Sequence, residues 1–172
     1  MMWYNGGIAP PHIMAVVTNA LNYAQIDTTT FDGVSLVVTL PAAFSDTCTK
    51  QCVPGILGNL KKIKDAGAKH VILVCSDQPF AIAEWVRYSQ WGTADVTFAS
   101  DFGCFQMREI VGRVSEEEGK KNLPRALGDL LRRAYVVFKD GKIAGKYIEP
   151  DALAFTLNVN ELIAGITAQA AF

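Results

Sequence analysis

Two short apolar runs most constrain the fold of this chain. They cover residues 34–40 and 71–75 and are rich in β-branched residues, a composition typical of buried strands. A helical pattern follows each run: apolar residues recur at helical spacing over 48–65, and a proline opens a second helix over 79–90. Strands that alternate with helices predict a parallel sheet covered by helices.

The later elements continue this alternation and then close the fold differently. We expect a strand at 96–98, a helix over 104–111, strands at 134–138 and 142–148, and a last helix that begins near Asn158. Asp140-Gly141 joins the two late strands and is a strong signal for a β-hairpin. A thioredoxin-like fold ends with a hairpin and a helix. The expected fold class is therefore α/β, a thioredoxin-like fold whose central mixed sheet is flanked by helices on both faces.

Length and charge indicate one ordinary globular domain. The 172 residues fit a single domain over 1–172, with 1–33 as an N-terminal extension. The 16 basic residues nearly balance 17 acidic ones, which argues against nucleic acid as a partner. The apolar piece at 8–21 contains two prolines and is too short to span a bilayer, so we expect no membrane partner either.

The first part of the chain bears on the compartment. It has neither the cationic start and apolar core of a secretory signal nor the Arg-rich composition of a transit peptide, since no Arg precedes Arg87. We therefore expect a cytoplasmic protein, with an organelle reached through a presequence outside this chain as the alternative. The first 49 residues also hold no Lys, Arg or Glu.

Four cysteines cluster in one third of the chain: Cys48, Cys52, Cys75 and Cys104. The Cys-x3-Cys spacing of the first two has no second pair and no nearby His, so it predicts no zinc site. We expect no metal and no other cofactor. In a reducing compartment such cysteines are buried apolar residues or a single reactive thiol rather than bridges. Cys75 and Cys104 are predicted to be core residues.

The segment that carries chemistry runs from Pro41 to Cys48, between a buried strand and a helix. A cysteine in the first turn of a helix meets unpaired backbone N–H groups and the positive end of the helix dipole. Both favour thiolate, the form that attacks peroxides and disulfides. Ser45 can place a hydroxyl beside the sulfur, and Pro41 can shape the loop and shield one side from water.

This segment resembles the Pro-x-x-x-Thr/Ser-x-x-Cys motif of the peroxiredoxins, matched by Pro41, Ser45 and Cys48. Further motifs of the type II branch follow in the same order over about residues 34–170: Val53-Pro54-Gly55, Ser76-Asp-Gln-Pro79-Phe80 with Trp85, Arg133, and Glu149-Pro150-Asp151. Because the separated motifs keep their order, the resemblance is specific.

The resemblance implies an activity and a set of roles. Peroxiredoxins reduce hydrogen peroxide, alkyl hydroperoxides or peroxynitrite, and an external thiol such as glutathione with glutaredoxin, or a thioredoxin-like protein, restores them. Cys48 would be the peroxidatic nucleophile and become a sulfenic acid. Arg133 would stabilise its thiolate and the charge that develops on the peroxide, and Ser45 would hydrogen-bond the thiolate and the peroxide.

The family also implies a homodimer through the loops around the active site. Pro41 would shield the site from water. Phe44 and Phe80 would line the substrate pocket or the dimer surface, and core packing is the alternative for both.

Several positions depart from the family pattern. Asp46 replaces a proline and places a carboxylate two residues from Cys48. Its charge opposes thiolate formation unless it points to water or pairs with a cation such as Lys50. A further arginine that the family often carries is Leu130 here.

The recycling route is where the pattern departs most. Neither position that carries the resolving cysteine in type II peroxiredoxins is a cysteine in this chain. The human-type position corresponds to Leu157, and the plant-type position lies near Leu73. Cys52 stands where the branch often has His. It is a possible resolving residue, and a substituted residue of the core or of the pocket wall is the equally open alternative. On an α-helix it could face Cys48, but a disulfide between positions i and i+4 needs unwinding.

The sequence thus leaves four hypotheses. The first is a thiol peroxidase with a one-cysteine cycle, and the second is a peroxidase in which Cys52 resolves Cys48. The third is a non-enzymatic thiol sensor or interaction module, which the changes at Ala42, Asp46 and Cys52 keep open. The fourth is a copper carrier, for which the Cys-x3-Cys spacing lacks a well-placed His.

Overall fold

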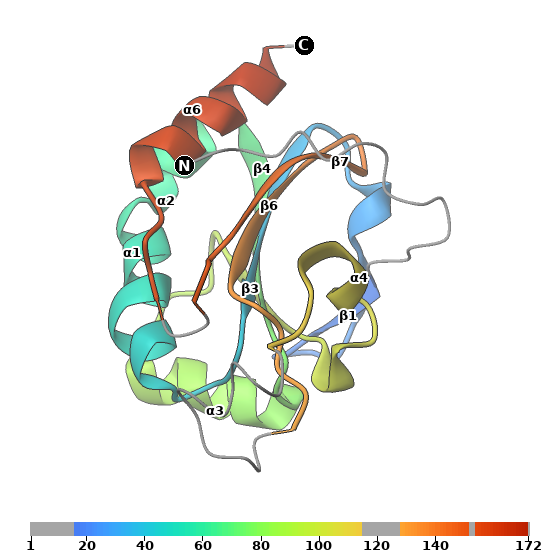
Figure 1. The fold of residues 1–172 in the computed structure, drawn as a ribbon, viewed down its shortest axis with the longest axis vertical. Coiled ribbons are helices and arrows are strands. Elements are labelled where there is room, and N and C mark those ends of the chain that lie inside the picture. Colours follow the sequence, from blue (N-terminus) through green and yellow to red (C-terminus); the bar gives the residue numbers. More distant parts are fainter. Residues whose placement is uncertain (1–15, 115–127, 152–153, 172) are drawn as a thin grey trace.

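A seven-stranded mixed sheet forms the centre of the molecule (Figure 1), in the strand order β2-β1-β5-β4-β3-β6-β7. The computed structural model describes residues 16–114, 128–151 and 154–171. The strands are β1 (Val16–Asn19), β2 (Gln25–Asp27), β3 (Val34–Leu40), β4 (Ala68–Cys75), β5 (Thr97–Ser100), β6 (Ala134–Lys139) and β7 (Lys142–Ile148). The pairs β3–β4 and β4–β5 are parallel, whereas β6 and β7 are antiparallel to their neighbours.

Helices pack on both faces of this sheet, as the sequence predicts. They are α1 (Val53–Gly58), α2 (Leu60–Asp65), α3 (Pro79–Ser89), α4 (Arg108–Val111) and α6 (Val159–Ala170). A π-helical segment, η2 (Cys48–Cys52), precedes α1, and two 3₁₀ helices are η1 (Thr28–Thr30) and η3 (Phe102–Cys104).

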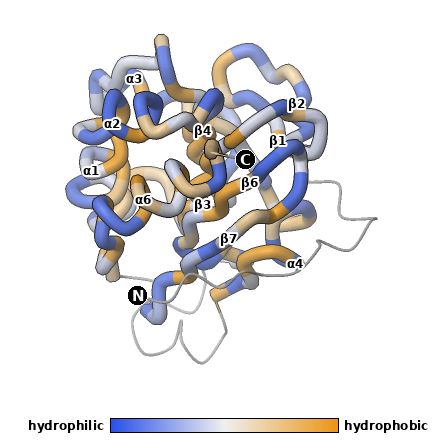
Figure 2. Tube along the Cα trace, turned by 90° about the horizontal axis from the view of Figure 1, so that it is seen from above, coloured by the Kyte–Doolittle hydropathy of each residue, from blue (hydrophilic) through white to orange (hydrophobic). Residues whose placement is uncertain are grey.

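Two clusters of buried side chains form the core, one on each face. The first joins β3 and β4 to α1, α2, α3 and α6, and the second joins the opposite face of the sheet to α4. Figure 2 shows the hydrophobic colour concentrated on the central strands, whose residues are almost all buried. The period-two alternation of a strand therefore supplies both cores at once.

The predicted helix over 48–65 is wrong as a continuous α-helix. It starts with a π-helical segment and breaks at Asn59, whose backbone (φ −111°, ψ 10°) leaves the helical region. The Asn59 side-chain amide donates to the Gly55 carbonyl at 2.8 Å. Because a side chain takes the acceptor that the backbone N–H would use in an α-helix, the helix ends and α2 begins anew.

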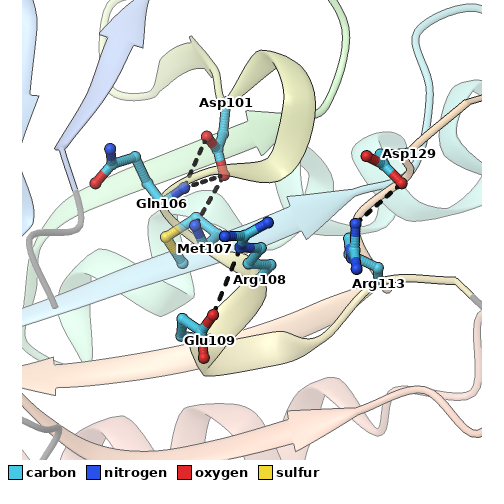
Figure 3. A network of polar contacts seen from close by, with 7 residues as sticks. All are labelled: Asp101, Gln106, Met107, Arg108, Glu109, Arg113 and Asp129. Atoms are coloured by element: carbon cyan, nitrogen blue, oxygen red, sulfur yellow. Dashed lines mark hydrogen bonds and ion pairs between the residues drawn. The ribbon is translucent and has the colours of Figure 1, made fainter.

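The predicted helix over 104–111 begins too early. Cys104 has a left-handed backbone (φ 60°), and α4 starts only at Arg108. The Asp101 carboxylate accepts from the backbone N–H groups of Gln106 (3.1 Å) and Met107 (2.8 Å), as Figure 3 shows. This side chain holds a turn that delays the helix.

The segment before β3 joins the sheet. Strands β1 and β2 form an antiparallel hairpin, and β1 pairs antiparallel with β5. Within the described ranges, no helix is long and apolar enough to cross a membrane.

The turn between β6 and β7 has the conformation that its sequence predicts. Asp140 (φ 49°) and Gly141 (φ 76°) both adopt positive φ, as the favoured two-residue hairpin requires. The Asp140 carboxylate accepts from the Gly33 N–H at 2.7 Å, so the turn also holds the start of β3. A Cβ atom at Gly141 would overlap with the Thr29 carbonyl oxygen.

We expect Gly141→Ala to lower the free energy of unfolding by at least about 1–2 kcal/mol, because a left-handed backbone disfavours a side chain and the Thr29 carbonyl blocks it. Gly58→Ala is the matched control, since nothing lies within 4 Å of its Cβ position, and it should raise stability by about 0.4–1 kcal/mol. Urea unfolding followed by circular dichroism measures both. Equal effects of the two substitutions would contradict this account of the turn.

Candidate active site

Cys48 lies in the first turn of a helix, as predicted, and its side chain is fully buried. Helical residues begin at Asp46, and Cys48 is 0% exposed. The Thr49 N–H donates to the Ser45 carbonyl at 2.9 Å and closes this first turn. The sulfur therefore lies at the positive end of a helix and away from water, where fixed dipoles act on it strongly.

Arg133 supplies the cation that the first 49 residues lack. Its Nη1 donates to Cys48 Sγ at 3.1 Å, and the residue is 1% exposed. Burial by itself lowers the pKa of this guanidinium, but the neighbouring sulfurs of Cys48 and Cys52 offset that effect and raise the pKa. Arg133 therefore remains a cation next to the sulfur.

The β3–β6 pairing explains how residues 85 positions apart in the chain meet. Thr39, near the end of β3, pairs with Ala134, and its hydroxyl donates to the Arg132 carbonyl at 2.7 Å. β3 ends where the loop before Cys48 begins. The register of the β3–β6 pair therefore places Arg133 close to that loop.

Cys52 shares this environment with Cys48. It is fully buried, interacts electrostatically with the Arg133 guanidinium, and lies 3.9 Å from the Tyr135 hydroxyl. Burial raises the pKa of the Cys52 thiol to about 11, with Arg133 opposing the shift. The segment from Cys48 to Cys52 is π-helical rather than α-helical, a conformation often found at functional sites.

The loop that leads to Cys48 is held by residues that follow β4. Ser76 Oγ donates to the Pro41 carbonyl at 2.6 Å, and the Asp77 carboxylate accepts from the Ala43 N–H at 2.6 Å. Pro41 is buried. The Pro41 motif and the Ser76-Asp77 motif thus belong to one hydrogen-bonded unit, which no spacing rule shows.

Ser45 differs from the expected arrangement. Within the described loop its hydroxyl donates to the Ala42 carbonyl at 2.7 Å rather than to Cys48. The hydroxyl hydrogen therefore points into the loop, and the role of Ser45 toward thiolate or peroxide stays a prediction.

The carboxylate of Asp46 points to water and pairs with Lys50. The two charged groups are 2.5 Å apart, and both side chains are more than 70% exposed. Asp46 raises the pKa of Lys50 through this pair. The Asp46 carboxylate therefore both lies in solvent and pairs with a cation, the two arrangements that the sequence analysis named for it.

The two aromatic residues expected around the pocket lie at the surface. Phe44 is 53% exposed and packs against Trp85 and Tyr88, and Phe80 is 62% exposed and packs against Tyr23. Trp85 links the first group to the site, since its Nε1 donates to Thr49 Oγ1 at 3.0 Å. The structure thus connects Phe44 to the helix of Cys48.

The other two cysteines are core residues, as predicted. Both Cys75 and Cys104 are buried, and burial raises the pKa of the Cys75 thiol well above its ordinary value and that of Cys104 to about 11. Among the residues that the structure describes, no three His, Cys, Asp or Glu side chains gather as metal ligands would.

Tyr135 is a site residue that reasoning from the sequence missed. It lies two positions after Arg133, and its hydroxyl donates to Glu149 Oε1 at 3.0 Å. Residues i and i+2 of a strand point to the same face, so the strand prediction over 134–138 contained the signal. The sequence presents the partner, Glu149, only as part of the Glu149-Pro150-Asp151 motif.

The fold and the site define the class of this chain: a thioredoxin-like α/β protein with a buried cysteine in the first turn of a helix and an arginine beside its sulfur. The model of the Redoxin family matches residues 12–161, and the chain belongs to this family. The expected resemblance to the type II peroxiredoxins is confirmed.

Similar sequences carry peroxiredoxin names. Peroxiredoxin-2F, mitochondrial, of Arabidopsis thaliana is 30% identical over 78% of this chain and 64% of its own length. Peroxiredoxin AHP1 of Chaetomium thermophilum is 25% identical over 64% of this chain and 57% of its own length. The putative peroxiredoxin of Malassezia furfur is 29% identical over 40% of this chain, and the match spans 41% of that relative.

Similar solved structures confirm the fold. Reduced Prx3 from Vibrio vulnificus in complex with H₂O₂ superposes with a TM-score of 0.77 at 13% identity, covering 96% of both chains. Peroxiredoxin 5 from Alvinella pompejana gives 0.70 at 18% identity, covering 95% of this chain and 97% of its own. The thioredoxin-like fold expected from the sequence is therefore correct.

We expect Arg133→Met to slow the alkylation of Cys48 by iodoacetamide by roughly tenfold or more, because a hydrogen bond to a charged group is lost. Asp46→Asn is the control and should change the rate by less than about twofold, since exposed ion pairs contribute little. Mass spectrometry of the Cys48 peptide measures both rates. A slower reaction in Asp46→Asn than in Arg133→Met would show that Arg133 does not control this thiol.

Proposed function

We propose that the protein is a peroxiredoxin-type thiol peroxidase that reduces hydrogen peroxide and alkyl hydroperoxides at Cys48. One observation carries the proposal: the Arg133 guanidinium lies 3.1 Å from the sulfur of a cysteine in the first turn of a helix. Both features favour the nucleophilic thiolate, and family membership supports the same chemistry.

The peroxide step follows from these positions. The Cys48 thiolate attacks one oxygen of the peroxide, an S–O bond forms and the O–O bond breaks. The product is the Cys48 sulfenic acid, and the departing oxygen takes a proton and leaves as water or alcohol. Arg133 stabilises the charge that moves onto the departing oxygen, Ser45 binds the peroxide, and Pro41 keeps bulk water from the sulfur.

An external thiol returns the enzyme to its reduced form. The thiol attacks the sulfur of the sulfenic acid, water leaves, and a second thiol resolves the mixed disulfide. Glutathione with glutaredoxin, or a thioredoxin-like protein, supplies these thiols. Because Cys48 is 0% exposed, the first helical turn has to open before a macromolecular reductant reaches the sulfur.

Cys52 offers a second route for this recycling, supported by its electrostatic interaction with the guanidinium that also holds Cys48. Its thiol would attack the Cys48 sulfenic acid, so that a disulfide forms and water leaves. A pKa of about 11 keeps Cys52 mostly protonated at neutral pH, which slows this attack. We therefore place the external thiol first.

The protein also acts as a homodimer in this proposal. Phe44, Phe80 and Tyr88 are large apolar residues, each more than half exposed, and such residues mark interaction surfaces when they gather. Phe44 adjoins the first turn of the Cys48 helix, in keeping with an interface formed by the loops around the site.

The compartment proposed is the cytoplasm. Four free thiols, all buried, fit a reducing environment. Relatives are named mitochondrial, chloroplastic or peroxisomal, and the location of a fluorescent fusion distinguishes these compartments.

Cys48→Ser should abolish hydroperoxide consumption, because a hydroxyl cannot replace the thiolate as nucleophile. Cys104→Ala is the matched control and should retain the activity, since Cys104 is a core residue. Consumption is measured with glutathione plus glutaredoxin and with thioredoxin. If the wild type consumes peroxide no faster than Cys48→Ser with every reductant, the protein is a sensor or interaction module instead.

After one equivalent of peroxide, intact-mass spectrometry should show a gain of about 16 Da on Cys48 for a sulfenic acid. A loss of about 2 Da that Cys52→Ser removes would instead assign the dithiol route. If Cys52 resolves, disulfide formation accelerates as pH rises toward its pKa of about 11.

Tyr88→Ser should weaken the dimer and lower the sedimentation coefficient at micromolar concentration, because the Tyr88 side chain is 77% exposed. Lys61→Ser is the control, as it changes an exposed side chain on another helix. Identical monomer sedimentation of the wild type and both variants would exclude the dimer.

A further inference from the structure

Glu149 is fully buried, and its carboxylate accepts several hydrogen bonds. Its Oε1 accepts from the Tyr135 hydroxyl (3.0 Å), the Thr156 N–H (2.8 Å) and the Leu157 N–H (3.1 Å). Its Oε2 accepts from the Thr156 hydroxyl at 2.5 Å. Three of these four bonds come from residues 156 and 157, so the carboxylate holds this short segment in place.

The same segment holds Arg133. The Arg133 Nε donates to the Ala154 carbonyl at 3.0 Å, while its Nη1 donates to Cys48 Sγ at 3.1 Å. Because a guanidinium is planar and rigid, two bonds at different nitrogens set the direction of the group. The position of the Ala154 carbonyl therefore decides where the Nη1–H points.

Residues 154–158 belong to neither a strand nor a helix, and α6 begins only at Val159. No sheet or helix ladder fixes the backbone of this segment, so side chains have to do so. The Phe155 ring packs against Gly55 of α1, and the Tyr147 hydroxyl shares a hydrogen bond of 2.8 Å with Thr156. The bonds to Glu149 are charge-assisted, which makes them the stronger restraint.

We propose that Glu149 is a positioning residue for the peroxidatic site. Its carboxylate anchors residues 156 and 157, this anchor fixes the Ala154 carbonyl, and the carbonyl aims Arg133 at Cys48. A second arm reaches the site through the Tyr135 hydroxyl, which lies 3.9 Å from Cys52 Sγ. The proposal rests on the proposed function in that Cys48 is taken as the reacting thiol.

A role in stability alone would leave a different signature. If Glu149 merely stabilised the fold, its replacement would lower the reaction rate of Cys48 by the same factor whether or not Arg133 is present. If it acts through Arg133, its effect disappears when Arg133 is removed. A double-mutant cycle separates the two cases, because residues that act as a unit are not additive.

The experiment measures the second-order rate constants for reaction of Cys48 with H₂O₂ and with iodoacetamide, in the wild-type and the Arg133→Met backgrounds. Glu149→Ala should lower both rate constants by roughly tenfold in the wild-type background and by less than about twofold with Arg133→Met. Iodoacetamide separates the two proposals: it reports on the placement of Arg133 even if the protein consumes no peroxide.

Removing a buried carboxylate can prevent folding, so Thr156→Val is the second variant. It removes the hydroxyl donor at nearly constant volume, leaves the Thr156 N–H bond, and should slow Cys48 by roughly threefold. Thr156→Ser restores the hydroxyl and should recover the wild-type rates. Circular dichroism and thermal unfolding establish that each variant is folded.

Three results would overturn the proposal. They are equal losses in both backgrounds, wild-type rates in folded Thr156→Val, and failure of Thr156→Ser to recover the rates. If Cys48 reacts with peroxide in neither the wild type nor any variant, while the iodoacetamide rates follow the expected cycle, the peroxidase assignment is overturned. The positioning role is then supported.

Discussion

The contact between the Arg133 guanidinium and the Cys48 sulfur is the interaction on which the rest of the site depends. Burial disfavours a thiolate, and the first 49 residues offer no cation to compensate. Lys50, the first cation in the chain, is exposed and paired with Asp46. The positive charge thus has to arrive from a distant part of the chain, and the pairing of β6 with β3 brings it there.

A buried arginine creates demands of its own. Its N–H groups need acceptors, because an unpaired buried charge is strongly unfavourable. Cys48 and the Ala154 carbonyl provide acceptors, and the position of that carbonyl follows from the bonds between Glu149 and the segment that precedes α6. The candidate active site therefore extends from the first turn of the Cys48 helix to the segment between β7 and α6.

The sheet sets the remaining geometry. β3 and β4 are parallel, so their carboxyl ends lie at the same edge, where open α/β sheets place their ligand sites. The loop after β3 carries Cys48, and the turn after β4 carries Ser76 and Asp77, which bind the backbone of that loop. Trp85 of α3 adds a hydrogen bond to Thr49. The turn after β4 thus hydrogen-bonds the backbone of this loop, and α3 adds a hydrogen bond to the first turn of the Cys48 helix.

Residue types and spacing by themselves determined the α/β class, most strand positions, Cys48 in a first helical turn, the need for a distant cation, and the core placement of Cys75 and Cys104. These features depend on local periodicity and on motifs, which a sequence records directly. Only the tertiary structure decided the π-helical geometry between Cys48 and Cys52, the break at Asn59, the turn that Asp101 holds, and the joining of Tyr135, Glu149 and Ala154 to the site. In each of these cases a side chain interacts with a backbone or charged group for which other groups also compete. Most of these partners become neighbours only when the chain folds. A linear sequence does not show which of the competing groups will be close enough to form the interaction.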